Sequence, residues 1–455
     1  MIGSGIPGRE GLGTPGHPSR PGRARRVGDA QHTRLANGLD VLVVENDVVP
    51  LVTIEIDVKN GAYTETPEYD GLSHLYEHMF FKANERIPDQ EAYLRRAREL
   101  GMEWNGTTSD ERVNYFFTLH RKNLEAGLQF MSDAIRTPLF RKDEIERERP
   151  VVLGEYDRAE SDPTYHLVVA VQKAIWHTYY TRKNVLGTRE IIETATTEKM
   201  RTIQKRFYVP NNSALLISGD VDPDAALQAV ESIFGDWQRG PDPFEADPIP
   251  HHPPLETRAA FVVEKPVQAI SLLAAFHGPS VELDRQATYA ADVFSFILGQ
   301  RNSRFYRRLV DSGLCASASL SYQTLRYTGP VHVFLRTDVE HFRAAHEALW
   351  DEISHFADAD AFSDQELENA KHQLEVDHIY ELERPSQHVH TVGYWWAVAD
   401  LDYYHDYVAN LRRVSREDIV SYVRRYIVGQ PSVTGVLLSP EMRARLGDPI
   451  GELQP

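Results

Sequence analysis

Three residues in one short stretch, His74, Glu77 and His78, have the types and the spacing of a metal-dependent hydrolytic site. They lie between Gly71 and Lys82 (GLSHLYEHMFFK) in the order His-x-x-Glu-His, the inverse of the commoner His-Glu-x-x-His. On a helix, residues four apart share one face, so both imidazoles could bind the same ion. Glu77 could take a proton from a water held there, and zinc suits two histidines, one carboxylate and an open position. The alternative is a helix whose histidines are ordinary surface or core residues.

A third ligand would have to come from another helix, and residues 143–158 offer one. Glu155 follows a short apolar run in this stretch. Glu148 lies seven residues earlier, which is two helical turns away on the same face, so it could orient a histidine from behind the ligands. Because acidic residues are frequent here, an ordinary charged face is the alternative for Glu148. Pro150 is expected to kink the helix.

The elements that position these residues can be predicted from hydrophobic periodicity and turn signals. Two strands flank an Asn-Gly turn within residues 34–44, and Gly101 is expected to end a helix. Further strands are predicted at 51–58, 113–119 and 213–218, and helices at 72–81, 89–100, 123–136 and 143–159.

The second half of the chain repeats the first. Phe140 to Asp157 corresponds to Phe362 to Ile379, and Leu186 to Leu215 corresponds to Tyr407 to Val433. Each copy runs strands, helices, strand, helices, strand. Strands that cluster together with helices, without strict alternation, predict an α+β fold of two homologous domains. Each domain would be a mostly antiparallel β-sheet flanked by helices.

The domain limits follow from this repeat and from composition. We expect a disordered tail rich in Gly, Pro and Arg (1–31), a catalytic domain (32–239), a Pro-rich linker (240–254), a homologous noncatalytic domain (255–440) and a second tail (441–455). The first tail has no apolar segment typical of a secretory signal, so a cytoplasmic location is expected, with a periplasmic one as the alternative if the true start differs.

Composition excludes several classes of protein. The content of 42% hydrophobic and 25% charged residues is typical of a globular protein, and no apolar run approaches the ~18 residues of a membrane span. Cys315 is the single cysteine, which excludes an intramolecular disulfide. A net charge of −18 argues against nucleic acid and leaves basic ligands open. His388 and His390 are expected to be exposed polar residues and not a second metal site.

Several segments in register resemble one known family. His74 to His78, followed by Glu155 within ERERPVVLGE, is similar to the inverzincin peptidases of the pitrilysin family. Residues 105–115 (NGTTSDERVNY) resemble the family's Asn-Ala-x-Thr-Ser-x-Glu-x-Thr-x-Tyr segment, with Gly106 in place of the usual alanine. The resemblance covers residues 32 to 440. It is greatest to the short-chain branch related to mitochondrial processing peptidase.

The resemblance implies roles for individual residues. It implies one Zn²⁺ per chain, with the ligands His74, His78 and Glu155. Glu77 would be the general base, and Glu148 would orient one of the two histidines. Asn105 and its strand would bind the main chain of the substrate. The expected function is a zinc-dependent endopeptidase that cleaves unfolded or extended peptides in a chamber formed by paired subunits. Two alternatives are a noncatalytic structural or assembly subunit and a module that binds peptides without cleaving them.

The second half departs from the family pattern. Complete sites of the family receive an arginine and a tyrosine from the second domain, to stabilise the oxyanion. In the matching segment, Ala316 stands in the tyrosine position and Leu309 in the arginine position. We therefore expect a heterodimer with a related subunit that carries the Arg–Tyr pair, or a less active homodimer. One missing oxyanion donor typically costs on the order of 10²–10³ in rate.

Overall fold

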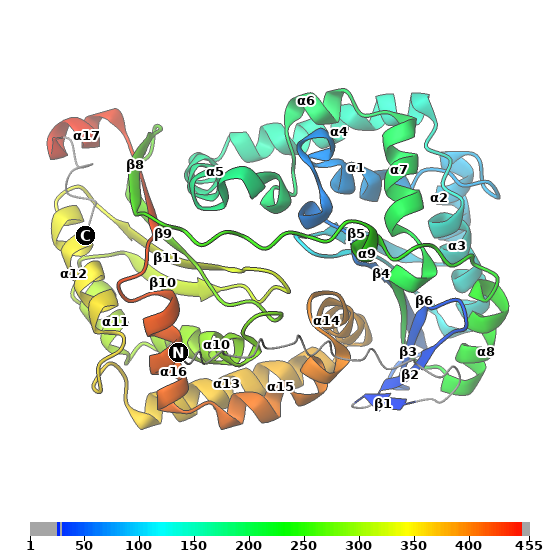
Figure 1. Cartoon of the computed structure of the whole chain (residues 1–455). Helices are drawn as coiled ribbons and strands as arrows, with labels where there is room; N and C mark the ends of the chain where they lie inside the picture. The colour runs from blue at the N-terminus through cyan, green and yellow to red at the C-terminus, as the bar shows by residue number, and fades with distance from the viewer. Residues whose placement is uncertain (1–24, 28–29, 448–455) are drawn as a thin grey trace, which may run out of the picture.

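The computed structural model describes residues 25–27 and 30–447, and it folds into two halves joined by a long connection (Figure 1). The first half holds the strands β1 Arg25–Val27, β2 Ala30–Arg34, β3 Asp40–Glu45, β4 Leu51–Val58, β5 Glu103–Thr108, β6 Val113–His120 and β7 Ser213–Gly219. The second half holds β8 Ala259–Glu264, β9 Ile270–His277, β10 Ser317–Tyr322, β11 Pro330–Thr337 and β12 Val433–Leu438.

Helices surround both sheets. Those of the first half and the connection are α1 Leu72–Phe80, α2 Gln90–Glu99, α3 Leu124–Arg136, α4 Lys142–Glu160, α5 Pro163–Trp176, α6 Arg189–Glu193, α7 Thr197–Phe207, α8 Pro223–Phe234 and α9 Pro243–Ala246. Those of the second half are α10 Arg285–Gly299, α11 Arg304–Tyr306, α12 Phe342–His355, α13 Asp364–Leu382, α14 Pro385–Val398, α15 Leu401–Arg413, α16 Arg416–Tyr426 and α17 Pro440–Leu446. In the described part of the chain, no helix is long and apolar enough to cross a membrane.

The two sheets share one topology. The first has the order β1-β2-β3-β7-β4-β6-β5 and the second the order β10-β11-β9-β12-β8. When the second order is read in reverse, β8-β12-β9-β11-β10 corresponds to β3-β7-β4-β6-β5 of the first sheet. In both series the first pair is parallel and the others are antiparallel. The predicted fold of two homologous α+β domains is therefore confirmed, with sheets that are mixed because of that parallel pair.

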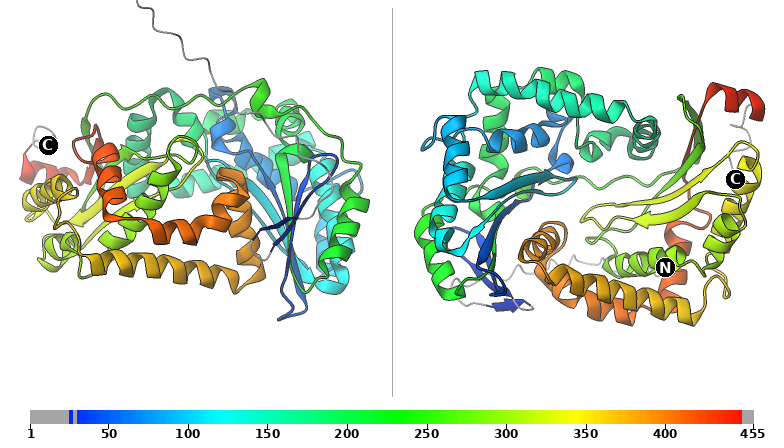
Figure 2. Two further views of the ribbon diagram at one scale, coloured as in Figure 1. Left: turned by 60° about the horizontal axis from the view of Figure 1, so that its bottom comes forward. Right: turned by 180° about the vertical axis from the view of Figure 1, so that it is seen from behind.

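Each sheet is buried on both faces, and each half supplies one helix to the other. Alternate residues of β3 point to opposite faces, as the pleat requires. Val41 and Val43 join the core beneath the helices of the first half, whereas Leu42 and Val44 contact α14 of the second half. Reciprocally, α5 of the first half packs on β9 and β12 of the second sheet. This exchange interlocks the halves; the right view of Figure 2 shows α14, in orange, beside the first sheet.

Polar contacts accompany α14 on the first sheet. Trp396 donates its indole N–H to Asp40 Oδ2 at 3.0 Å. His390 pairs with the buried Glu55, and His388 is itself buried, so the prediction that these histidines are exposed is wrong. The error has a physical cause, because α14 of the second half lies on one face of the sheet built by the first half, over β4 and β7, and no local pattern in the sequence indicates such a contact.

The structured region extends past the predicted limits at both ends. Strand β1 pairs with β2 through Val27 and Ala30, ahead of the predicted boundary at residue 32. At the other end, Ser439 caps α17 by accepting from the N–H of Met442, and Leu446 is buried. The predicted disorder of residues 1–24 lies outside the described residues. A kink was expected in α4 at Pro150. The helix runs without a break through Pro150 to residue 160.

Candidate metal centre

Helix α1 presents the His-x-x-Glu-His motif on one face and a core face on the other. Leu75, Tyr76, Met79 and Phe80 are buried, whereas the three motif residues are half-buried. A helix of nine residues is marginal alone and depends on such packing. Its first turn is also fixed, because the carboxylate of Glu65 accepts the backbone N–H groups of Gly71 and Ser73, each at 2.7 Å. The N–H of Ser73, in the first turn, has no partner within the helix, so the hydrogen bond to Glu65 satisfies it.

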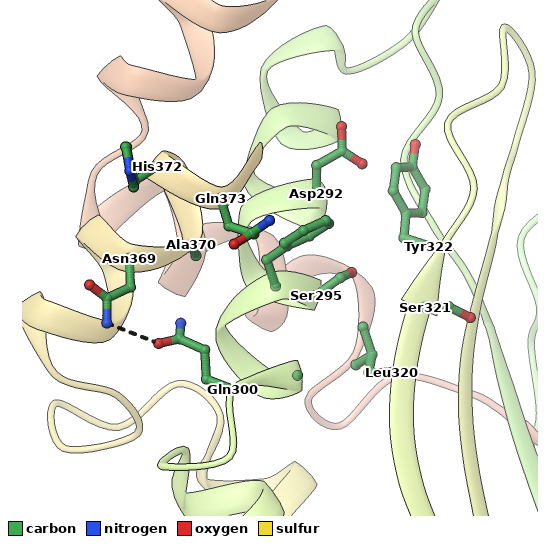
Figure 3. Close-up of a pocket in the computed structure, with 12 residues that line it drawn as sticks. Asp292, Ser295, Gln300, Leu320, Ser321, Tyr322, Asn369, Ala370, His372 and Gln373 are labelled. Carbon is green, nitrogen blue, oxygen red and sulfur yellow. Dashed lines mark hydrogen bonds between the residues drawn. The ribbon is translucent and has the colours of Figure 1, made fainter. Parts of the chain in front are cut away.

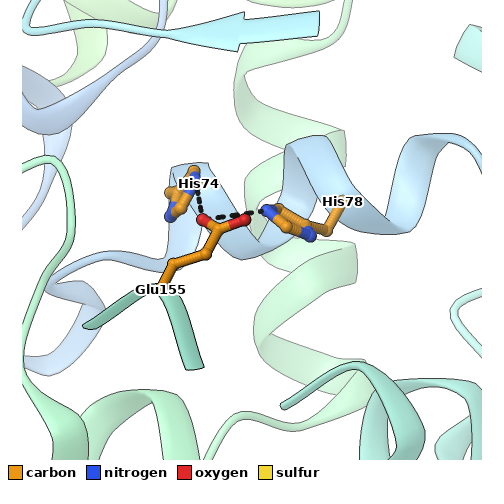
Figure 4. Close-up of side chains that lie close together, drawn as sticks. All are labelled: His74, His78 and Glu155. Carbon is orange, nitrogen blue, oxygen red and sulfur yellow. Dashed lines mark ion pairs between the residues drawn. The ribbon is translucent and has the colours of Figure 1, made fainter. Parts of the chain in front are cut away.

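Helix α4 brings Glu155 to the two histidines, as Figure 4 shows. Glu155 Oε2 lies 3.4 Å from His74 Nε2 and 3.7 Å from His78 Nε2. The imidazole rings are nearly perpendicular, with centroids 4.9 Å apart. One possible ligand atom from each residue lies within 4.8 Å of the other two. Within the described residues no other His, Cys, Asp or Glu group meets that criterion.

Glu148 lies behind this group and contacts His78. Its Oε1 is 3.0 Å from His78 Nδ1, and its Oε2 is 2.5 Å from Lys82 Nζ. Burial acts against the charged form, but the hydrogen bonds from His78 and Lys82 hold the pKa of Glu148 below its usual value. A carboxylate at Nδ1 favours the tautomer with its proton on Nδ1, which leaves the Nε2 lone pair facing Glu155.

The donor set fits zinc on this geometry. Two imidazole nitrogens and one carboxylate oxygen converge, and one histidine has the carboxylate partner that orients metal-binding histidines. Burial also lowers the pKa of His74 to about 4, with a smaller contribution from the charge of His78. His74 is therefore neutral near pH 7, the form in which imidazole binds a metal. At His78 burial acts in the same direction, but the neighbouring carboxylates, Glu148 first, raise the pKa overall.

Glu77 lies beside the convergent group. Thr108 of β5 donates its hydroxyl to Glu77 Oε2 at 2.7 Å. Burial raises the pKa of Glu77, and the hydrogen bond from Thr108 only partly offsets this. A carboxylate whose pKa is raised toward neutrality is suited to accepting and returning a proton.

Strand β5 forms the free edge of the first sheet and runs beside α1. Asn105 is exposed on this strand, and a Cβ at Gly106 would lie 3.0 Å from Glu77 Cγ. Glycine at this position therefore leaves room around Glu77. Trp104, also exposed, stacks on Phe81 with ring centroids 4.6 Å apart.

Two contacts in this site were not predicted from the sequence: Thr108 with Glu77, and Lys82 with Glu148. Thr108 belongs to the 105–115 segment that resembles the family, and that segment was the available signal. Lys82 follows His78 by four residues and lies two residues past the end of α1, so helical spacing continued beyond the helix could have placed the two on one side. The other predicted residues, His74, Glu77, His78, Glu148 and Glu155, are brought together by the structure, whereas Asn105 lies on the adjacent edge strand.

The second half offers no replacement for the missing arginine and tyrosine at the matching positions. Leu309 is fully buried in the core of that half, and Ala316 is an exposed residue without a polar side chain. Arg308 lies close by, but it pairs with Asp351 and Glu352.

Two family models match the chain. The model described as insulinase, peptidase family M16, matches residues 41–189. The model described as the peptidase M16 inactive domain matches residues 194–374. The His-x-x-Glu-His motif and Glu155 fall within the first match, and the second covers most of the described second half before α14.

Known proteins resemble the chain over half of its length or more. An uncharacterized zinc protease of Rickettsia felis is 23% identical over 365 residues, which cover 79% of this chain and 86% of the relative. The mitochondrial-processing peptidase subunit beta of Blastocladiella emersonii is 25% identical over 50% of this chain and 49% of that protein. A solved protease from Helicobacter pylori has the same fold, with a TM-score of 0.80 and 20% identity over 90% of this chain and 99% of that one.

Proposed function

Because the chain belongs to the insulinase family of peptidases, family M16, also known as the pitrilysin family, we propose that it is a zinc-dependent endopeptidase that cleaves extended peptides. One observation carries the proposal: His74, His78 and Glu155 converge from two helices, with the carboxylate of Glu77 beside them. A subunit with only a structural role would not need this convergence.

His74, His78 and Glu155 would hold the zinc ion. When bound, zinc would supply Lewis-acid polarisation of the scissile carbonyl. Glu77 would accept the proton of the attacking water and return it to the departing amine. The hydroxyl of Thr108 holds the Glu77 carboxylate in one orientation, and Glu148 holds the imidazole of His78.

The substrate would bind along β5. A free edge strand can take an extended peptide as an additional strand, and its main-chain hydrogen bonds recognise conformation more than sequence. Asn105 would contribute a side-chain contact to that peptide. Because α1 lies beside β5, a peptide added to this edge would pass Glu77. Unfolded or extended segments are therefore the expected substrate class.

A second subunit would complete the site. Leu309 and Ala316 stand in the positions of the Arg–Tyr pair. Hydrogen-bond donors to the oxyanion would therefore have to come from another subunit. We propose a dimer that encloses a chamber, with a related subunit that carries the pair. The name of the Blastocladiella relative as a subunit of a processing peptidase is consistent with this proposal.

Chelation distinguishes the three candidate functions. Cleavage of a fluorogenic unstructured peptide, followed with the chain alone and with a partner, should stop when a zinc chelator is added and return with zinc. Peptide binding that survives chelation, without any cleavage, would indicate a module that captures peptides. A chain that takes up no zinc would indicate an assembly subunit.

A further inference from the structure

A cavity of about 800 Å³ lies in the second half, between α10, β10 and α13 (Figure 3). Its size falls within the range of ligand-binding pockets. Asp292 and Phe296 of α10 and Tyr322 of β10 line it, and Ala370 of α13 forms part of the opposite wall. The zinc-dependent chemistry proposed for the first half does not use this cavity.

The cavity is the counterpart of the metal centre in the duplicated fold. Helix α10 follows β9 as α1 follows β4, and α13 packs on α10 as α4 packs on α1. Buried and half-buried residues alternate identically along α1 and α10 when Asp292, Ser295 and Phe296 are placed opposite His74, Glu77 and His78. The repeat likewise places Ala370 opposite Glu148. The groove is therefore retained, while both histidines and Glu77 are replaced; Asp377, which the same register places opposite Glu155, keeps a carboxylate.

The carboxyl group of Asp292 has no countercharge among the described residues. It accepts the hydroxyl of Tyr407 at 2.8 Å and, more weakly, that of Thr324 at 3.4 Å. Both donors are neutral, and in the described part of the chain no Lys, Arg or His forms an ion pair with Asp292. Burial raises the pKa of Asp292 to about 7 despite the two hydrogen bonds. A cation brought to this carboxylate would relieve the cost of ionising it.

Aromatic rings lie beside the carboxylate in the same cavity. Figure 3 shows the carboxyl group of Asp292 on the side of the groove that carries the Tyr322 ring. Phe296 lies one helical turn further along α10. A carboxylate together with aromatic faces is the combination that recognises organic cations, through charge and cation–π attraction. The acidity of the whole chain, at −18, would favour a basic ligand further.

We propose that this groove binds a lysine or arginine side chain of a peptide, with Asp292 as the counterion and Phe296 and Tyr322 as its aromatic walls. The proposal deepens the proposed function, since it takes the ligand to be a segment of the peptide substrate. It gives the second half, which lacks the metal-binding motif, a role in choosing substrates. The binding can be measured without cleavage, so the two proposals can fail separately.

The test compares matched peptides on zinc-loaded protein that carries Glu77→Gln, so that no peptide is consumed. Fluorescence anisotropy would give the affinity for extended peptides with one lysine or arginine. Their partners would carry norleucine or citrulline at the same position, and each peptide would be made with a free and with an acetylated N-terminus. We expect the basic side chain to tighten binding about tenfold, whether or not the N-terminus is acetylated.

Two variants locate the effect. Asp292→Asn should abolish the preference for basic peptides and leave binding of the neutral ones unchanged. Glu347→Gln, which alters an exposed carboxylate of the same half, should keep the preference. Equal affinity for basic and neutral peptides would overturn the proposal, as would a preference that disappears on acetylation or survives Asp292→Asn. If Asp292→Asn does not fold, the comparison of matched peptides on the Glu77→Gln chain still decides. Loss of cleavage by the unaltered chain would count against the peptidase function and not against this site.

Discussion

Replacement of Glu77 by glutamine should leave zinc bound and reduce peptide cleavage by about 10²–10⁴-fold, the range typical of general acid–base catalysis. Glutamine has the same shape and can still accept the hydroxyl of Thr108, which contacts Glu77 Oε2 at 2.7 Å. It cannot take up the proton of the attacking water. Because Glu77 is not among the three convergent ligands, metal content should not change.

The measurement is kcat together with zinc per chain, on the intact protein and on the variant. Glu146→Gln is a matched control, because Glu146 is exposed on α4 and lies outside the convergent group. It should keep full activity. A Glu77→Gln enzyme that retains turnover within a few-fold of the intact one would exclude Glu77 as the base. Loss of zinc in that variant would instead assign Glu77 a part in holding the metal.

Addition of a related subunit that carries the Arg–Tyr pair should raise cleavage strongly above that of the pure chain. Loss of one hydrogen-bond donor to the oxyanion typically lowers the rate by a factor on the order of 10²–10³. In the site proposed here, zinc is the group that would stabilise the oxyanion. The chain cannot readily supply the arginine itself. Leu309 is fully buried, and a charged side chain there would be placed in an apolar core.

Activity would be followed as the candidate partner is titrated into a fixed amount of this chain, with the particle mass measured in parallel. Stimulation should saturate at one partner per chain. A partner with its arginine and tyrosine replaced should bind but stimulate little. If no such partner exists, we expect a homodimer that cleaves slowly. An isolated monomer as active as complete enzymes of the family would contradict the assembly proposal.

Features that depend on local pattern could be predicted from the sequence. The spacing of His74 and His78 predicted one helical face, and the structure places both rings there. The repeat between the halves predicted two similar domains, and the shared strand order confirms the fold. Glu148 lies seven residues before Glu155, and it lies on the same side of α4, next to His78.

Features that depend on contacts between distant segments could not be predicted. The packing of α14 on the first sheet pairs His390 with the buried Glu55, because a helix of one half covers the sheet of the other. The hydrogen bond from Thr108 to Glu77 joins a strand and a helix 31 residues apart. The lone Asp292 is an unremarkable residue of α10 in the sequence. That no Lys, Arg or His among the described residues pairs with it is visible only once the neighbouring helices and strands are in place.

The orienting role proposed for Glu148 allows a graded test of the proposed metal centre. Glu148→Gln keeps the volume of the side chain but removes the charge that favours the proton on His78 Nδ1. It should keep a zinc ion, with an affinity about 10–100-fold weaker in competition with a chelator. An unchanged affinity would show that Glu148 does not orient His78.

The most direct test of the central claim is the zinc content of His74→Ala. Zinc per chain would be measured after dialysis, for the intact protein and for this variant, with thermal unfolding as the check that both are folded. The intact chain should hold close to one zinc. Because the variant lacks one of the three convergent ligands, His74→Ala should hold close to none. A folded His74→Ala protein that still holds one tightly bound zinc per chain would contradict the assignment of the metal to His74, His78 and Glu155.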